Sequence, residues 1–228
     1  MVKFVESELQ QLRNEVYDMW TLVNSQMELA RQAVLSMDRN IAQQVIVRER
    51  RVDAMELKID SEVEDFIALY TPVAVDLRFV LAMFKINNDL ERIGDYADGI
   101  ARFVKDSDAD SIDAGLVEAL QIEKMFSTLL IMMDDLKQAL MDEDASRATS
   151  VIAMDDTLDS IKAASTGILV DYARKNIDAM PLCMGLGGVF RKLERTGDHL
   201  SNIAEDIVFF IDAKVLKHMD SPSSQVKA

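Results

Sequence analysis

Hydrophobic residues recur three and four positions apart along most of the chain and form six long stripes. Each stripe repeats at about 3.6 residues per turn, the period of an amphipathic helix, and none alternates with the period of two that indicates a strand. The stripes cover approximately residues 5–34, 41–70, 79–104, 122–140, 151–172 and 189–210. The pattern therefore predicts an all-α protein with six long helices.

Polar or proline-containing segments separate the stripes and predict where helices end. Asp38 offers a carboxylate that can cap the start of the second helix. Thr71 places a hydroxyl before Pro72, and because proline suits a first helical turn, we expect this pair to open the third helix. Asp76 would then lie near the positive end of the helix dipole. Residues 105–113 are polar, acidic and aperiodic, which predicts a linker.

The chain contains an internal repeat. Residues 90–95 (LERIGD) match residues 193–198 (LERTGD) at an offset of 103 positions. Short connections make sequential helices antiparallel neighbours, and three such helices can enclose one core. We therefore predict two tandem antiparallel three-helix bundles, a first repeat at 1–105 and a second at 112–217, followed by a frayed tail at 218–228.

Composition and charge exclude several classes of function. Acidic residues outnumber basic ones 40 to 25, so the net charge is −15, which argues against a nucleic-acid partner and against binding to anionic lipids. One cysteine cannot form an internal disulfide, and two histidines with one cysteine cannot build a His/Cys zinc site. No run of 18 apolar residues is present, and the N-terminal segment does not resemble a signal peptide. We therefore expect a cytoplasmic protein.

The repeated motif contains paired carboxylates. Glu91 and Asp95 lie one turn apart on the same face of the third predicted helix, and Gly94 lies between them. Repulsion between the two charges costs a few tenths of a kcal/mol, and the glycine costs about 1 kcal/mol relative to alanine. Glu194 and Asp198 repeat this arrangement, again with a glycine. A local rule broken twice in the same way indicates a function or a tight packing demand.

The second predicted helix carries acids at matching spacing. Asp53, Glu56 and Asp60 follow one side of this helix, and Asp156 and Asp159 are the counterparts of the first two at the same offset. If neighbouring helices turn these rows toward each other, the carboxylates repel unless cations join them. Oxygen-preferring cations are the natural ligands, so the sequence predicts a metal cluster on the surface of each bundle.

The simpler alternative is a solvated acidic surface, because an arginine within each motif can neutralise the acids. The sequence has no nucleophile–base pattern and none of the Glu-x-x-His pairs of ferritin-like di-iron proteins. We therefore expect no catalytic residue and no organic cofactor. A metal-dependent hydrolase is a further hypothesis, since two metals held by acids can activate water.

Residues 91–95 and 194–198 resemble the paired E-x-x-x-D motifs of the PhoU family, and residues 72–78 (PVAVDLR) resemble the stretch that opens its third helix. The resemblance extends over residues 5–215. It implies a cytoplasmic, homodimeric all-α protein that acts between a phosphate transporter, through its ATPase component, and a sensor histidine kinase. Such proteins are negative regulators that restrain the phosphate-starvation response when phosphate is plentiful, and they reach the membrane only through protein partners.

The family also implies multinuclear metal clusters, with iron first among the candidates and zinc, manganese, nickel, magnesium or calcium as alternatives. Carried over by position, the metal ligands are Asp53, Glu56, Asp60, Glu91, Asp95, Asp156, Asp159, Glu194 and Asp198. The chain departs from the family pattern at Gly99, where an asparagine is common, and at Ala163, the counterpart of Asp60. The Asp-Leu-Arg of residues 76–78 also has no counterpart in the second half. We therefore expect unequal metal loading of the two sites.

The leading hypothesis is a non-enzymatic regulator of phosphate transport that binds metal and docks on protein partners. The alternatives are a purely structural helical adaptor without metal, or a PhoU-like accessory of a different phosphate carrier.

Overall fold

The computed structural model describes residues 2–213, and these residues form helices and turns without any strand. In chain order the helices are α1 (Val2–Ser36), α2 (Arg39–Tyr70), α3 (Ala74–Asp106), α4 (Ala114–Ala119), α5 (Ile122–Asp142), α6 (Ala145–Ile152), α7 (Asp155–Lys175), the 3₁₀ helix η1 (Ile177–Ala179) and α8 (Met180–Asp212). The all-α prediction is confirmed.

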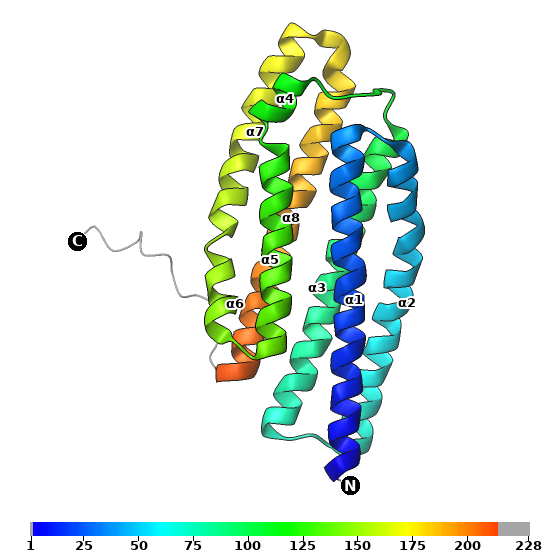
Figure 1. The fold of residues 1–228 in the computed structure, drawn as a ribbon, viewed down its shortest axis with the longest axis vertical. Helices are drawn as coiled ribbons and strands as arrows, with labels where there is room; N and C mark the ends of the chain where they lie inside the picture. The colour runs from blue at the N-terminus through cyan, green and yellow to red at the C-terminus, as the bar shows by residue number, and fades with distance from the viewer. Residues whose placement is uncertain (1, 214–228) are drawn as a thin grey trace, which may run out of the picture.

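The helices form two antiparallel three-helix bundles that lie side by side (Figure 1). The first bundle contains α1, α2 and α3, which contact one another in every pairing. The second contains α5, the consecutive helices α6 and α7, and α8. The bundles join where α3 contacts α8 and α1 contacts α5. The fifth predicted helix is thus two helices, α6 and α7, and the short helix α4 lies outside the six predicted stripes.

The predicted stripes form the core. Hydrophobic residues from all the long helices are buried in one cluster that continues across both bundles. Trp20 of α1 is fully buried, and its indole Nε1 donates a hydrogen bond to the backbone oxygen of Met133 in α5 at 3.2 Å. This bond satisfies the polar edge of a large buried ring and links the two bundles.

The helix ends follow local chemistry. Asp38 caps α2 as predicted, since its Oδ1 accepts hydrogen bonds from the backbone N–H of Asn40 at 2.7 Å and of Ile41 at 3.3 Å. The prediction for Thr71 is wrong, because this residue ends α2 in the left-handed region at φ 49° and does not cap α3. Pro72 disfavours helical backbone at the preceding residue, so a turn intervenes before α3 begins at Ala74.

The remaining boundaries are consistent with the acidic composition of the connections. Asp76 lies in the first turn of α3, as predicted. The chain is non-helical over 107–113, and the Oδ1 of Asp113 caps α4 by accepting from the N–H of Leu116 at 3.0 Å.

The predicted frayed tail lies outside the described residues, and the division into repeats at 105 and 112 stays a prediction. No helix within residues 2–213 is long and apolar enough to cross a membrane.

Candidate functional site

The two predicted acid rows of the first bundle lie within electrostatic range of each other. Burial raises the pKa of Glu91 on α3, and the negative charges of Asp95, Glu56 and Asp53 raise it further, against the opposing effect of Arg92. Glu56 and Asp53 belong to α2. Neighbouring carboxylates therefore disfavour one another's ionised form across the α2–α3 contact.

An amide from α3 holds the α2 row in place. Asn87 is fully buried, and its Nδ2 donates to Asp60 Oδ1 at 2.8 Å and to the backbone oxygen of Glu56 at 3.1 Å. Burial raises the pKa of Glu56, and the charges of Asp60 and Asp53 add to this effect while Arg92 opposes it. Asn87 thus fixes the side of α2 that carries the acids.

Arg92 partly neutralises the motif to which it belongs. Its Nε lies 3.2 Å from Glu91 Oε2, and its Nη1 lies 3.0 Å from Asp95 Oδ2. The Arg92 side chain is 57% exposed, so each pair is a surface ion pair of modest strength. A cation that binds these carboxylates would compete with this arginine.

A buried carboxylate that the sequence analysis missed lies behind the acid rows. Burial raises the pKa of Glu49 to about 7, a hydrogen bond from Gln26 opposes this, and the charges of Asp95 and Asp53 raise it further. Gln26 Nε2 donates to Glu49 Oε2 at 2.8 Å, whereas Glu49 Oε1 has no hydrogen-bond partner among the described residues. An acid on the apolar stripe of α2 is the sequence feature that indicates this site.

The glycine of the first motif makes room for this buried pair. A Cβ at Gly94 would lie 3.1 Å from Val52 Cγ1, 3.4 Å from Gln26 Oε1 and 3.5 Å from Glu49 Oε1. A side chain at this position would therefore press against α1 and α2 together. The glycine is explained by close helix packing beside the acids.

The second bundle repeats the arrangement with a different acid. Burial raises the pKa of Asp155 to about 6, the charges of Asp159, Asp198 and Asp156 raise it further, and a hydrogen bond from Ser201 opposes them. Ser201 Oγ donates to Asp155 Oδ2 at 3.4 Å, while Asp155 Oδ1 has no hydrogen-bond partner among the described residues.

The sequence predicts Asp156 and Asp159 as ligands but does not predict Asp155. At the repeat offset Asp155 is the counterpart of Val52, so an apolar position of the first bundle has become acidic in the second. The backbone of Gly197 approaches this acid closely, because a Cβ there would lie 2.4 Å from Asp155 Oδ1. Both glycines therefore occupy equivalent close contacts between helices.

The two acidic sites differ in charge. Lys162 Nζ lies 3.6 Å from Glu194 Oε1, and Arg195 Nη1 lies 3.4 Å from Asp198 Oδ2. The first bundle has Ile59 at the position equivalent to Lys162. The second site thus has one more cation near its motif and, because Ala163 replaces an aspartate, one acid fewer.

The acids are chemically suited to bind a cation, but they do not form a complete coordination site. Within residues 2–213, no three histidine, cysteine, aspartate or glutamate side chains are already placed to hold one metal ion. The donors are carboxylates with raised pKa values at Glu56 and Glu91, and unpartnered buried oxygens lie behind them on Glu49 and Asp155. This donor set fits oxygen-preferring cations. The nine-residue ligand set stays a prediction.

His199 lies beside Asp198 but faces the other bundle. Its Nδ1 is 2.7 Å from Asp89 Oδ1, and its Nε2 is 3.4 Å from the hydroxyl of Tyr96. Both partners belong to α3, so both ring nitrogens are engaged at the contact between α3 and α8. These contacts give His199 a structural role between α3 and α8.

These features define a class of protein: two packed helical bundles, each with an acidic surface at a close helix–helix contact. The model of the PhoU domain matches residues 16–104 and 122–207, one segment in each bundle. The chain belongs to the PhoU family.

Curated relatives match nearly the whole chain. A phosphate-specific transport system accessory protein PhoU homolog of Deinococcus radiodurans is 31% identical over 211 residues, which cover 92% of this chain and 98% of the relative. A protein of the same description from Caulobacter vibrioides is 33% identical over 216 residues, 94% of this chain and 93% of the relative.

Solved structures share the fold. The crystal structure of PhoU from Pseudomonas aeruginosa is 30% identical, with a TM-score of 0.83 over 92% of this chain and 99% of that one. The phosphate transport system regulatory protein PhoU from Streptococcus pneumoniae has a TM-score of 0.84 at 24% identity, covering 93% of this chain and 99% of that one, and this likeness concerns the fold alone.

Proposed function

We propose that this protein is a cytoplasmic, non-enzymatic regulator of phosphate transport that restrains the phosphate-starvation response. Its full-length relatives are described as accessory proteins of the phosphate-specific transport system, and the chain spans more than nine-tenths of the two cited above. The observation that carries the proposal is the pair of acidic surfaces, which recur at equivalent places in both bundles and each include a buried, unpartnered carboxylate oxygen.

The acidic surfaces would bind metal cations, iron first and otherwise zinc, manganese, nickel, magnesium or calcium. In the first bundle Glu91 and Asp95 would share the cations with Asp53, Glu56 and Asp60. A bound cation supplies positive charge that relieves repulsion among the carboxylates. Asn87 positions this row by its bonds to α2, and Arg92 would release the two α3 carboxylates that it now contacts.

The second bundle would use Asp156, Asp159, Glu194 and Asp198. Lys162 and Arg195 compete for the two α8 acids, so this site should bind cations more weakly than the first. The asymmetry follows from charge, because each competing ammonium or guanidinium must be displaced before a carboxylate can ligate a metal.

Regulation would pass through protein contacts. We propose that the partners are the ATPase component of a phosphate transporter and a sensor histidine kinase, and that a homodimer is the working unit. The net charge of −15 supports protein partners over direct binding to nucleic acid or anionic lipid, because both of these would be repelled.

A complementation assay tests the proposed function. In a bacterial strain whose own PhoU-family gene is deleted, expression of this chain should lower a phosphate-starvation reporter in phosphate-rich medium. A variant that combines Glu91→Ala, Asp95→Ala, Glu194→Ala and Asp198→Ala should fail to do so although circular dichroism shows it folded. If the unaltered chain, expressed at a normal level, leaves the reporter fully active, the proposed function is wrong.

One observation favours a second candidate, a helical adaptor without metal. Arg92 already contacts both acids of the first motif, and Arg195 contacts one acid of the second, so each surface is partly neutral without a cation. Under this alternative the four-alanine variant would still lower the reporter. An accessory role for a different phosphate carrier would instead appear as reporter control that persists when the ATP-driven transporter is absent.

A further inference from the structure

The α2–α3 turn, taken here as residues 67–75 with the adjoining ends of both helices, carries an unusual share of exposed hydrophobic side chains. Among the described residues, four of the thirteen large hydrophobic residues that are exposed lie within nine positions of each other: Ile67, Leu69, Val73 and Val75. Leu69 is 73% exposed and Val73 is 70% exposed. Isolated exposed hydrophobic residues need no explanation, but a local cluster marks an interaction site.

Two residues of this turn have strained backbone. Thr71 has φ 49° and Ala74 has φ 48°, and neither is a glycine. A β-branched residue in the left-handed region is an outlier, and such strain persists only where the surrounding structure imposes it. The turn therefore holds its apolar side chains in a definite outward arrangement.

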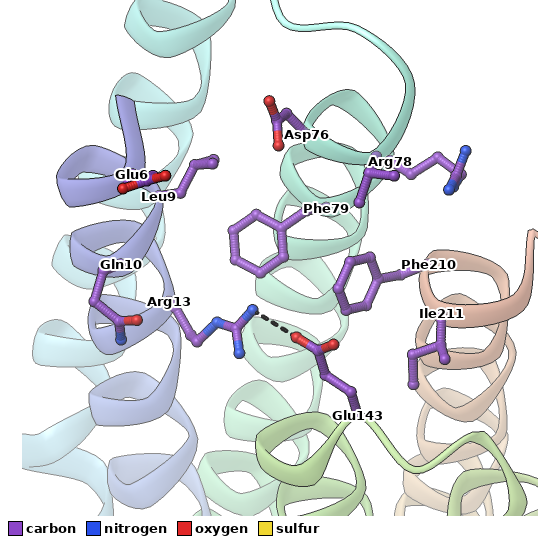
Figure 2. A pocket seen from close by; sticks show the side chains of 11 residues that line it. Glu6, Leu9, Gln10, Arg13, Asp76, Arg78, Phe79, Glu143, Phe210 and Ile211 are labelled. Carbon is purple, nitrogen blue, oxygen red and sulfur yellow. Dashed lines mark hydrogen bonds and ion pairs between the residues drawn. The ribbon is translucent and has the colours of Figure 1, made fainter. Parts of the chain in front are cut away.

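Two cavities flank the turn. The larger has a volume of about 330 Å³ and lies where the first turns of α1, the start of α3 and the end of α8 meet (Figure 2). The rings of Phe79 and Phe210 both line it and pack edge to face against each other, with their centroids 5.4 Å apart. The smaller cavity has a volume of about 180 Å³ and lies between α1 and the last turns of α2, where Leu69 and Phe66 form part of its wall.

Acidic side chains outnumber basic ones in both cavities. Six acids and two basic residues line them. The basic residues are Arg13 and Arg78. Arg13 is already engaged, since its Nη2 lies 3.1 Å from Glu143 Oε1 and its guanidinium lies 4.9 Å from the centre of the Phe79 ring. No basic residue lines the smaller cavity, although Lys58 reaches Glu62 from outside at 3.7 Å. This surface therefore attracts positive charge.

We propose that this surface docks a basic amphipathic helix of a partner protein. The docking surface consists of Glu62, Asp65, Leu69, Val73, Val75 and Asp76. The apolar side of the partner helix covers Leu69, Val73 and Val75, and its lysine and arginine side chains pair with the acids. Charge complementarity selects this occupant, because anionic lipids and nucleic acids would be repelled.

The proposal deepens the proposed function by naming the chemistry of the partner's docking segment, and it rests on that function only for the partner's identity. The acid rows on α2 and α3 and the docking surface are separate groups of residues. Binding at the docking surface can therefore be measured without metal and without a phosphate response.

The test uses a defined probe and the full chain. The probe is a fluorescein-labelled 18-residue peptide of leucine and lysine with a helical amphipathic pattern, titrated with chelated protein and followed by fluorescence anisotropy. The site variant Glu62→Gln/Asp65→Asn/Asp76→Asn should bind it at least tenfold more weakly. The matched control Glu118→Gln/Asp171→Asn/Asp178→Asn removes the same charge at the opposite end of the molecule and should change the affinity less than twofold (Figure 1).

Equal weakening by both triple variants would mean general attraction between charges and would overturn the proposal. The variant Leu69→Ser/Val73→Ser tests the apolar contact. It should weaken binding at least fivefold with an unchanged helical spectrum, and unchanged affinity would contradict the proposed geometry.

Other occupants give different results. If the chain's own residues 214–228 covered the surface, Lys214→Glu/Lys217→Glu would raise the affinity for the probe about tenfold, and this would overturn assignment to a partner. If a second copy of the chain covered it, the site variant would dissociate a dimer in sedimentation, with the same consequence. Failure of the peptide assay leaves the reporter assay unaffected, so the two proposals fail separately.

Discussion

The glycines of the repeated motif can be tested by adding a single methyl group at three helical positions. The changes are Gly197→Ala in α8, Gly94→Ala in α3 and Gly167→Ala in α7. Replacing glycine by alanine within a helix stabilises it by about 1 kcal/mol when nothing opposes the new methyl group. The three sites differ in what that group would meet.

The contacts around each glycine predict how the three variants differ in stability. At Gly167 the added Cβ has nothing within 4 Å, so we expect a gain of about 0.5–1 kcal/mol in the free energy of unfolding. At Gly94 the nearest atom, Val52 Cγ1, is 3.1 Å away, and a slight shift of this side chain should cancel the gain. At Gly197 the Cβ would lie 2.4 Å from Asp155 Oδ1 and 2.6 Å from Leu158 Cδ1.

Leu158 is fully buried, so its displacement disturbs the core of the second bundle. Overpacking of this kind costs about 1–3 kcal/mol, which exceeds the helical gain. We therefore expect Gly197→Ala to lose about 1–2 kcal/mol. Urea unfolding with chelator present, followed by circular dichroism, measures all three changes at constant slope. If Gly197→Ala stabilised the protein as much as Gly167→Ala, the packing explanation for the doubled glycine would be refuted.

Three further outcomes follow from single residues. The pKa of Glu49 is raised to about 7, so stabilisation from its bound proton is complete below about pH 4.5 and is lost as the pH rises through about 7. The free energy of unfolding of chelated protein, measured in urea, should therefore fall from pH 5 to pH 8, and Glu49→Gln should make this fall smaller by about 2–3 kcal/mol, while the raised pKa of Asp155 contributes a further part of it. Asp38→Ala should cost about 1 kcal/mol in thermal unfolding, whereas Thr71→Gly should gain about 1 kcal/mol because it relieves a left-handed backbone; the opposite order would contradict the assigned helix ends. Lys162→Ala should raise the affinity of the second acidic site for metal in calorimetric titration, and an unchanged affinity would show that its contact with Glu194 does not limit binding.

Much of the fold follows from the period of the sequence. Helical stripes must bury one face, so six stripes with short connections predict antiparallel bundles. The predicted cap at Asp38 depends only on the next few residues and is confirmed. The prediction that Thr71 caps α3 is wrong because proline restricts the backbone of the preceding residue, and this restriction outweighs the preference of a hydroxyl for a cap position.

The acidic surface was predictable only in part. The repeat offset located the rows at Asp53 and Asp156, since equivalent residues of two similar bundles occupy equivalent faces. Glu49 and Asp155 were missed because they stand at positions where the helical pattern expects apolar residues. Their burial, and the unpartnered oxygen that each retains, arise from contacts with α1 and α8 that sequence spacing cannot reveal.

The paired acid rows should bind metal cations, and elemental analysis of protein purified without chelator shows whether they do. We expect stoichiometric metal in the unaltered chain and its loss from the first site in Glu91→Ala/Asp95→Ala, which should remain folded because the change also removes repulsion. Chelation should lower the melting temperature, since a cation bound only by the native state adds about 2.7 kcal/mol at a hundredfold excess over its Kd. Protein that contains no stoichiometric metal and takes up none of iron, manganese or zinc on titration would contradict the claim.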